Sequence, residues 1–136
     1  MIAKTESELI ELGEHIGAKL KAPVVLELVG DVGAGKTTLA KGIARGLEID
    51  DEITSPSYTI SKRYRNGDIE LVHYDFYRLE DPGIMSEDLK ESLNDENTIT
   101  IIEWGNTIKN ILPEKHPKIT IRIKDDGSRE IETENL

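Results

Sequence analysis

The interpretation of this sequence depends on one stretch, Gly30-Asp31-Val32-Gly33-Ala34-Gly35-Lys36-Thr37. It matches the P-loop pattern G-x-x-x-x-G-K-[ST] in full. The apolar run Val24–Val29 directly precedes it and predicts a buried strand, whereas residues 36–44 predict a helix that leaves it. A strand, a glycine-rich turn and a helix N-terminus together make a binding site for phosphate groups.

The residue types in this loop suit the polyphosphate of a nucleotide. Glycine lets the backbone wrap closely around phosphate oxygens, so that successive N–H groups point inward. We expect Lys36 to reach the β- and γ-phosphates and the Thr37 hydroxyl to hold Mg²⁺. A turn without a ligand would also use glycine, but it would not need Lys-Thr at the helix start. The predicted nucleotide-binding residues of the loop are Asp31, Val32, Gly33, Ala34, Gly35, Lys36, Thr37 and Thr38.

Length and composition narrow the class of protein. A chain of 136 residues favours a single domain. Its net charge of −10 argues against direct, non-specific binding of nucleic acid, which relies on Lys and Arg. The sequence has no cysteine, which excludes disulfides and thiolate metal ligands. We find neither an apolar run long enough to span a bilayer nor a signal peptide at the N-terminus, so we expect no membrane association and a cytoplasmic location.

The other patterns predict a domain that mixes helices and strands. Thr5 to Glu8 form a capping box, which predicts a helix over residues 6–21. Asn66-Gly67 is a strong signal for a β-hairpin between two strands. Further strands are expected over residues 58–65, 69–74, 98–102, 118–124 and 129–133, and short helices over 86–93 and 108–112. The last two strands are expected to form an antiparallel hairpin.

Two carboxylates follow apolar strands directly. Asp75 comes after residues 69–74, and Glu103 comes after residues 98–102. A carboxylate in this position is typical of the Walker B element, which faces the metal-bound phosphates. Spacing does not rank the two, so one is expected to hold the Mg²⁺ shell while the other orients the attacking water. With Lys36, they are our candidate catalytic residues.

Four other features allow two interpretations each. The loop over residues 54–59 is either a switch that senses the γ-phosphate or an ordinary loop whose hydroxyls satisfy backbone groups. Arg78 is either a charge stabiliser or a cation at a helix end. Trp104 is a core or lid residue, and we interpret His73 as packed or on the surface rather than catalytic.

Several motifs behind the P-loop resemble those of one family. They are Ser55-Pro56-Ser57-Tyr58, His73-Tyr74-Asp75-Phe76-Tyr77-Arg78 and Ile102-Glu103-Trp104. With the P-loop, they resemble the TsaE (YjeE) family, small bacterial P-loop ATPases of tRNA threonylcarbamoyladenosine (t6A) biosynthesis. The resemblance extends over nearly the whole chain. It implies an α/β fold in which residues 1–136 form a single P-loop NTPase-like domain, with a mixed parallel and antiparallel central sheet flanked by helices.

The resemblance also implies ligands and partners. The ligands would be ATP and Mg²⁺ rather than GTP, and no N-K-x-D guanine motif follows the loop. The partners would be the proteins TsaB and TsaD, with tRNA contacted through that complex rather than directly. Hydrolysis of ATP would reset the complex between cycles of modification at adenosine 37 of the tRNA.

Particular site residues follow from the same resemblance. Thr37 and Glu103 would be linked to magnesium, and Thr5 and Glu6 would lie beside the adenine. Arg129 would contact the nucleotide, although Ser128 stands where the family usually has glycine. Residues 83–93 depart most from the family pattern, so contacts with a partner there are the least transferable.

Two other functions stay open beside a partner-activated ATPase. A small-molecule kinase could use the same loop, but it would need an acceptor pocket and a lid rich in Arg or Lys. A non-catalytic adaptor could use ATP merely to order the loop over residues 54–59. A slow ATPase activity of the isolated chain would be compatible with the adaptor and with the ATPase.

Overall fold

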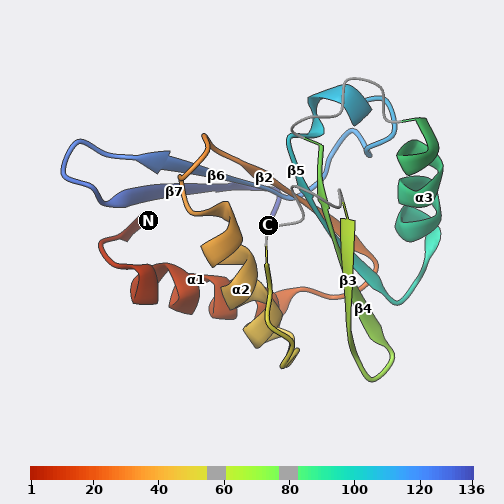
Figure 1. The fold of residues 1–136 in the computed structure, drawn as a ribbon, viewed down its shortest axis with the longest axis horizontal. Coiled ribbons are helices and arrows are strands. Elements are labelled where there is room, and N and C mark those ends of the chain that lie inside the picture. The colour runs from red at the N-terminus through yellow and green to blue at the C-terminus, as the bar shows by residue number, and fades with distance from the viewer. Residues whose placement is uncertain (55–60, 77–82) are drawn as a thin grey trace.

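A single twisted sheet of seven strands organises the chain (Figure 1). The computed structural model describes residues 1–54, 61–76 and 83–136, and all their side chains except those of residues 83–85, 106 and 107. The strands are β1 (Ile2–Ala3), β2 (Val24–Val29), β3 (Ser61–Asn66), β4 (Ile69–Asp75), β5 (Thr98–Glu103), β6 (Lys118–Ile123) and β7 (Arg129–Glu134). The helices are α1 (Glu6–Lys19), α2 (Lys36–Gly46), α3 (Gly83–Asn94) and the short 3₁₀ helix η1 (Gly105–Ile108).

The sheet mixes parallel and antiparallel pairs, as the family resemblance implies. Its strand order is β1-β7-β6-β2-β5-β4-β3. The inner pairs β6–β2, β2–β5 and β5–β4 are parallel, whereas β1–β7, β7–β6 and β4–β3 are antiparallel. The carboxyl ends of the parallel strands therefore meet at one edge of the sheet, where ligands of α/β proteins bind.

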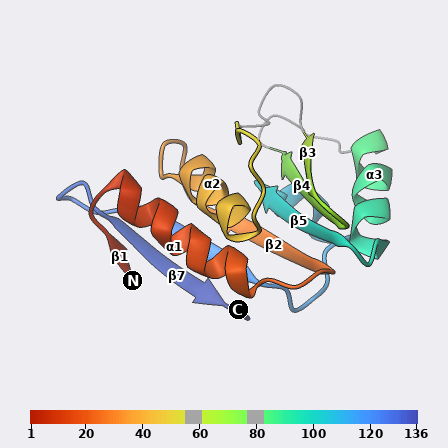
Figure 2. The same cartoon turned by 90° about the horizontal axis from the view of Figure 1, so that it is seen from below.

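Helices cover both faces of the sheet (Figures 1 and 2). Successive side chains of a strand point to opposite faces, so neighbours such as Leu71 and Val72 enter different cores. Leu71 packs in the larger core with α1 and α2, and Val72 packs in the smaller core with Leu89 of α3. Both cores are apolar and β5 lies between them, so all six of its residues are buried.

Glycines allow α1 and α2 to touch backbone to backbone. A Cβ atom placed on Gly42 would lie 2.2 Å from the Ile10 carbonyl oxygen, and one on Gly17 would lie 2.2 Å from the Ile43 carbonyl oxygen. Both distances are far shorter than van der Waals contact, so no other residue fits without a shift. Because α2 begins at the P-loop, this contact carries the N-terminal end of α1 toward the loop.

Most predicted elements are confirmed, and two are wrong in detail. The predicted helix over 108–112 is instead η1 followed by turns. Ile108 and Leu112 have helical spacing because both are buried against the sheet, not because a regular helix joins them. α3 begins at Gly83, ahead of the predicted start at residue 86. The two-residue strand β1 was too short to predict, and residues 58–60 of the predicted third strand lie outside the described residues.

Candidate nucleotide-binding site

The P-loop joins the end of β2 to the start of α2, as predicted. Gly33 and Gly35 have φ angles of 83° and 114°, a region that residues with a side chain rarely adopt. Gly30 has no room for a side chain, since a Cβ there would lie 2.8 Å from the Ile121 carbonyl oxygen. The three glycines therefore have conformational or steric reasons to be glycine, and the loop ends at a helix N-terminus suited to anions.

Lys36 lies buried beneath the loop with three neighbours. Its ammonium donates to the Gly30 carbonyl oxygen at 2.7 Å and lies 3.9 Å from Oε1 of Glu103. The same Nζ atom is 3.9 Å from the centre of the Trp104 ring. Burial lowers the pKa of Lys36, and the negative charges of Glu103, Asp75 and Asp31 oppose that shift.

The two candidate carboxylates end neighbouring parallel strands. Asp75 of β4 lies opposite Glu103 of β5 in the register, and both are buried. Side chains two or four residues apart on a strand point to the same face of the sheet. Asp75 is four residues from Leu71, and Glu103 is two residues from Ile101, so both carboxylates point to the face that α2 covers. The structure thus brings Lys36, Asp75 and Glu103 together, and it ranks neither carboxylate as the one that orients water.

His73 is a site residue that the sequence interpretation missed. Its Nε2 atom lies 2.5 Å from Oε2 of Glu103, and the side chain is 1% exposed. His73 precedes Asp75 by two residues on the same strand, so the two side chains share a face. The two-residue spacing of His73 and Asp75, together with the carboxylate at the end of the next strand of the sheet, is the sequence signal that could have identified His73 as a site residue.

A second group of predicted residues surrounds a pocket of about 200 Å³ beside the loop. Thr5 caps α1 by accepting a hydrogen bond from the Glu8 N–H at 3.1 Å, as the capping box predicts. The pocket is lined by Ala3, Lys4, Thr5, Glu6, Leu9, Gly33, Gly35, Thr38, Gly127 and Arg129. The predicted base-contacting residues thus lie beside loop residues, while Asp31 and Val32 are exposed.

Arg129 reaches the P-loop from β7. Its Nε donates to the Ala34 carbonyl oxygen at 2.8 Å, and its Nη2 donates to the Gly33 carbonyl oxygen at 3.3 Å. A third bond, from Nη1 to the Gly127 carbonyl oxygen at 2.6 Å, fixes the guanidinium to its own hairpin. The described contact of Arg129 is therefore with the loop backbone, and its contact with a nucleotide stays a prediction.

The residues present fit Mg²⁺ together with phosphate groups. Within residues 1–54, 61–76 and 83–136, we find no cluster of three or more His, Asp or Glu that could hold a metal alone. Mg²⁺ in nucleotide sites keeps several waters and needs only one or two protein oxygens beside the phosphates. The half-buried Thr37 hydroxyl and the Glu103 carboxylate supply hard oxygen donors of this kind.

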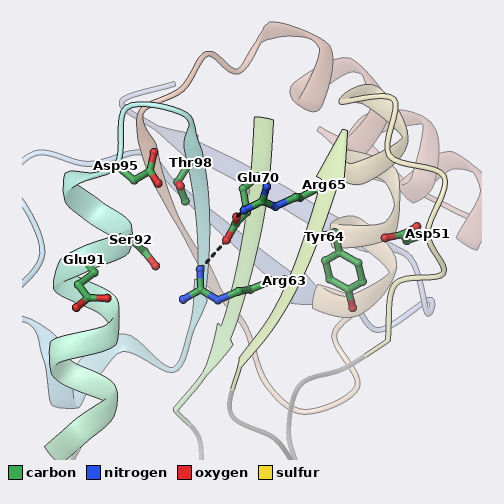
Figure 3. Close-up of a pocket in the computed structure, with 9 residues that line it drawn as sticks. All are labelled: Asp51, Arg63, Tyr64, Arg65, Glu70, Glu91, Ser92, Asp95 and Thr98. Carbon is green, nitrogen blue, oxygen red and sulfur yellow. Dashed lines mark hydrogen bonds and ion pairs between the residues drawn. The ribbon is translucent and has the colours of Figure 1, made fainter. Parts of the chain in front are cut away.

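Two further hollows differ in their relation to the loop. A cavity of about 490 Å³ borders Lys36 and Trp104 and extends to His116 and Lys118. A larger hollow of about 590 Å³ lies between α3 and the β3–β4 hairpin (Figure 3). Thr98 lines this larger hollow and begins β5, whose other end is Glu103, so the hollow belongs to the opposite edge of the sheet.

Some predicted features lie outside the described residues. They are the residues of the possible switch loop from Ser55 onward and Arg78. Within the described part of the chain, no helix is long and apolar enough to cross a membrane.

The sheet order, the loop and the buried lysine define a P-loop NTPase-like fold. A family model described as "Threonylcarbamoyl adenosine biosynthesis protein TsaE" matches residues 3–131. The chain therefore belongs to the TsaE family, which takes part in the biosynthesis of t6A in tRNA.

Named relatives agree with this assignment. A tRNA threonylcarbamoyladenosine biosynthesis protein TsaE from Nostoc sp. is 38% identical over 134 residues, covering 96% of this chain and 82% of the relative. The protein of the same name from Treponema pallidum is 34% identical and covers 96% of both chains. The crystal structure of YdiB from Bacillus subtilis matches with a TM-score of 0.78 and 34% identity, covering 96% of this chain and 80% of that one.

Proposed function

We propose that this chain is an ATPase that serves tRNA t6A modification by acting on a complex of TsaB and TsaD in the cytoplasm. The main support is the meeting of Lys36, Asp75 and Glu103 at the carboxyl edge of the parallel strands, beside the start of α2. The pocket of about 200 Å³ at Thr5, Glu6 and Arg129 supplies room for a base next to that phosphate site.

The loop and its neighbouring side chains divide the work of phosphate binding, metal binding and water activation. The loop N–H groups cradle the phosphates, and Lys36 neutralises charge on the β- and γ-phosphates. Thr37 and Glu103 would hold Mg²⁺, which would supply positive charge to offset the negative charge that develops on the phosphate groups during transfer. One of the two buried carboxylates, Asp75 or Glu103, orients the attacking water for in-line displacement.

The proposed link to partners rests on charge and on the relatives. A net charge of −10 disfavours direct contact with tRNA phosphates, so tRNA is reached through the partner complex. The matched relatives are named as tRNA threonylcarbamoyladenosine biosynthesis proteins. In some P-loop NTPases a partner protein completes the site by supplying a charge stabiliser in trans.

The test compares two lysines of α2. Lys36→Ala is expected to lower ATP hydrolysis by about 10²-fold or more, because it removes a preorganised cation from the developing charge. Lys41→Ala, five residues further on the same helix, is the matched control and should keep the activity. Rates are measured for the chain alone and with the TsaB–TsaD pair. Undiminished hydrolysis by the Lys36 variant would refute the ATPase.

The measurement with the TsaB–TsaD pair tests the proposed partners. Low hydrolysis by the chain alone that rises with the TsaB–TsaD pair would support activation by the complex. t6A formation that needs ATP binding but not its hydrolysis would instead favour the nucleotide-gated adaptor. An unchanged rate, together with undiminished t6A formation by the pair when this chain is omitted, would refute the proposed partners.

A second candidate is a small-molecule kinase. The cavity of about 490 Å³ that borders Lys36 and Trp104 is the observation that favours it, because an acceptor needs room beside the γ-phosphate. Transfer of labelled phosphate to an added nucleoside or metabolite would support the kinase, and release of free phosphate would support the ATPase.

A further inference from the structure

We propose that His73 is a positioning residue that holds the Glu103 carboxylate in the orientation needed for the metal–phosphate site. His73 Nε2 lies 2.5 Å from Glu103 Oε2. His73 is 1% exposed and Glu103 is 3% exposed. A hydrogen bond between two buried groups restricts the rotation of the carboxylate. This inference rests on the proposed function, since it assigns a role within the same site.

The Glu103 carboxylate has a different partner on each oxygen. Oε2 faces His73, whereas Oε1 lies 3.9 Å from the Lys36 ammonium. The lysine is expected to turn to phosphate oxygens once a nucleotide binds, and its attraction for Oε1 then weakens. His73 comes from β4 rather than from the loop, so its bond persists when Lys36 leaves. The histidine is thus the partner that fixes Glu103 in the loaded site.

The other ring nitrogen indicates why a histidine stands here. Among the described residues, His73 Nδ1 has no hydrogen-bond partner although it is buried. A neutral ring that donates from Nε2 leaves Nδ1 as an acceptor, which is less costly to bury unpaired than an N–H group. A polar atom buried without a partner costs stability, so a core-filling role alone would be served better by an apolar ring.

The sheet supplies the rigidity that such a role requires. His73 lies opposite Ile101, and Asp75 lies opposite Glu103, in the parallel register of β4 and β5. His73 and Glu103 are therefore diagonal neighbours on one face of two hydrogen-bonded central strands. Partners that orient a ligating side chain typically change metal affinity by about 10- to 100-fold when they are removed.

The experiment measures metal affinity directly, with Mn²⁺ as the probe. Mn²⁺ is titrated into the protein–ADP complex and followed by electron paramagnetic resonance, and ADP affinity is measured separately without metal. His73→Phe is expected to weaken Mn²⁺ binding by about 10-fold or more while metal-free ADP affinity changes less than about 2-fold. His73→Gln keeps an N–H donor near the position of Nε2 and should restore part of the affinity.

A control variant separates orientation from general damage to the core. Thr100→Val removes the Thr100 hydroxyl, the other buried polar atom without a partner among the described residues. Thr100 lies on β5 but faces away from Glu103, so Mn²⁺ affinity should not change. If His73→Phe fails to fold, as judged by urea unfolding, the smaller His73→Leu takes its place.

The outcomes are distinguishable. A folded apolar variant that binds Mn²⁺ as the unmodified protein does would overturn the role of His73 and leave the proposed function intact. Equal losses of Mn²⁺ affinity in the apolar and glutamine variants would also overturn it, because retaining a donor would then have no effect. Failure of the unmodified protein to bind ADP and Mn²⁺ would overturn both proposals.

Discussion

The Lys36 ammonium lies 3.9 Å from the centre of the Trp104 ring. Trp104 directly follows Glu103 and has a φ angle of 58°, which is a true outlier for a bulky residue. The conformation places an aromatic face over the cation, an arrangement worth about 0.5–2 kcal/mol. Backbone strain at Trp104 is therefore associated with the contact that covers Lys36 of the P-loop.

This contact predicts an optical signal for nucleotide binding. Trp104 is the single tryptophan of the chain, so its fluorescence reports on this position alone. Mg²⁺–ATP should change its emission in a saturable way, because phosphates draw the Lys36 ammonium from the ring. The measurement is a fluorescence titration beside calorimetry. Calorimetric binding without any change in emission would contradict the prediction.

Arg129 should matter for affinity through the shape of the loop. Arg129→Ala removes donors to the Gly33 and Ala34 carbonyl oxygens. Hydrogen bonds to charged groups contribute about 1.5–3 kcal/mol, so ATP binding should weaken by about 10-fold or more, measured by calorimetry. Arg122→Ala changes an exposed arginine of the neighbouring strand β6 and is the matched control. Equal affinity in the two variants would argue against a role for Arg129.

The contact between α1 and α2 reverses the usual effect of a Gly→Ala substitution on the stability of a helix. Gly→Ala within a helix usually stabilises by about 1 kcal/mol. Gly42→Ala should instead destabilise the protein by about 1–3 kcal/mol, because the new methyl group would meet the Ile10 carbonyl oxygen. Urea unfolding tests this, with the exposed Glu11→Ala of α1 as the control. A more stable Gly42 variant would show that the helices separate easily.

Tyr74 links the sheet to α3 and should confer a pH-dependent part of the stability. Its hydroxyl donates to Asp88 Oδ2 at 2.6 Å and lies 2.9 Å from Ser92 Oγ. Tyr74→Phe should lower the free energy of unfolding by about 1–2 kcal/mol at neutral pH. Tyr64→Phe is the control, since its hydroxyl accepts only a long hydrogen bond of 3.5 Å, from the Thr54 N–H, within the described residues.

The pH dependence of this effect has a definite sign. Burial, followed by the bond to Asp88, raises the pKa of Tyr74. The unfolded chain therefore loses the phenol proton first, and the folded state loses stability as pH rises above about 10. The stability difference between the unmodified protein and Tyr74→Phe should shrink between pH 7 and about pH 10.5. A difference that grows over that range would contradict the assigned shift.

Sequence patterns predicted the parts of the site that have local causes. The P-loop, the Thr5 cap and the strand-end carboxylates each depend on residues close together in the chain, and each stands where it was expected. The mixed sheet followed from the family resemblance and from the C-terminal hairpin. Asp75 and Glu103 lie close together because β5 pairs in parallel with β4, in the strand order β2-β5-β4. Local sequence patterns do not encode this strand order.

The missed features depend on contacts between distant segments. His73 gains its significance from Glu103, thirty residues later in the chain. Gly17 and Gly42 are needed because of a contact between two helices, and a helix pattern treats each glycine merely as a weak position. The error over residues 108–112 arose because apolar spacing records which residues are buried, not which backbone joins them.

The direct packing of α1 on α2 has a consequence for ligand length. Thr5 and Glu6 of the small pocket belong to the start of α1, and the phosphate loop leads into α2. Because glycines leave no side chain between the helices, backbone contact fixes the distance between the small pocket and the P-loop, which are the two halves of the site. We therefore predict that the site discriminates by molecular span: ATP and ADP should reach both halves, whereas pyrophosphate or free adenosine should fill only one and bind far more weakly.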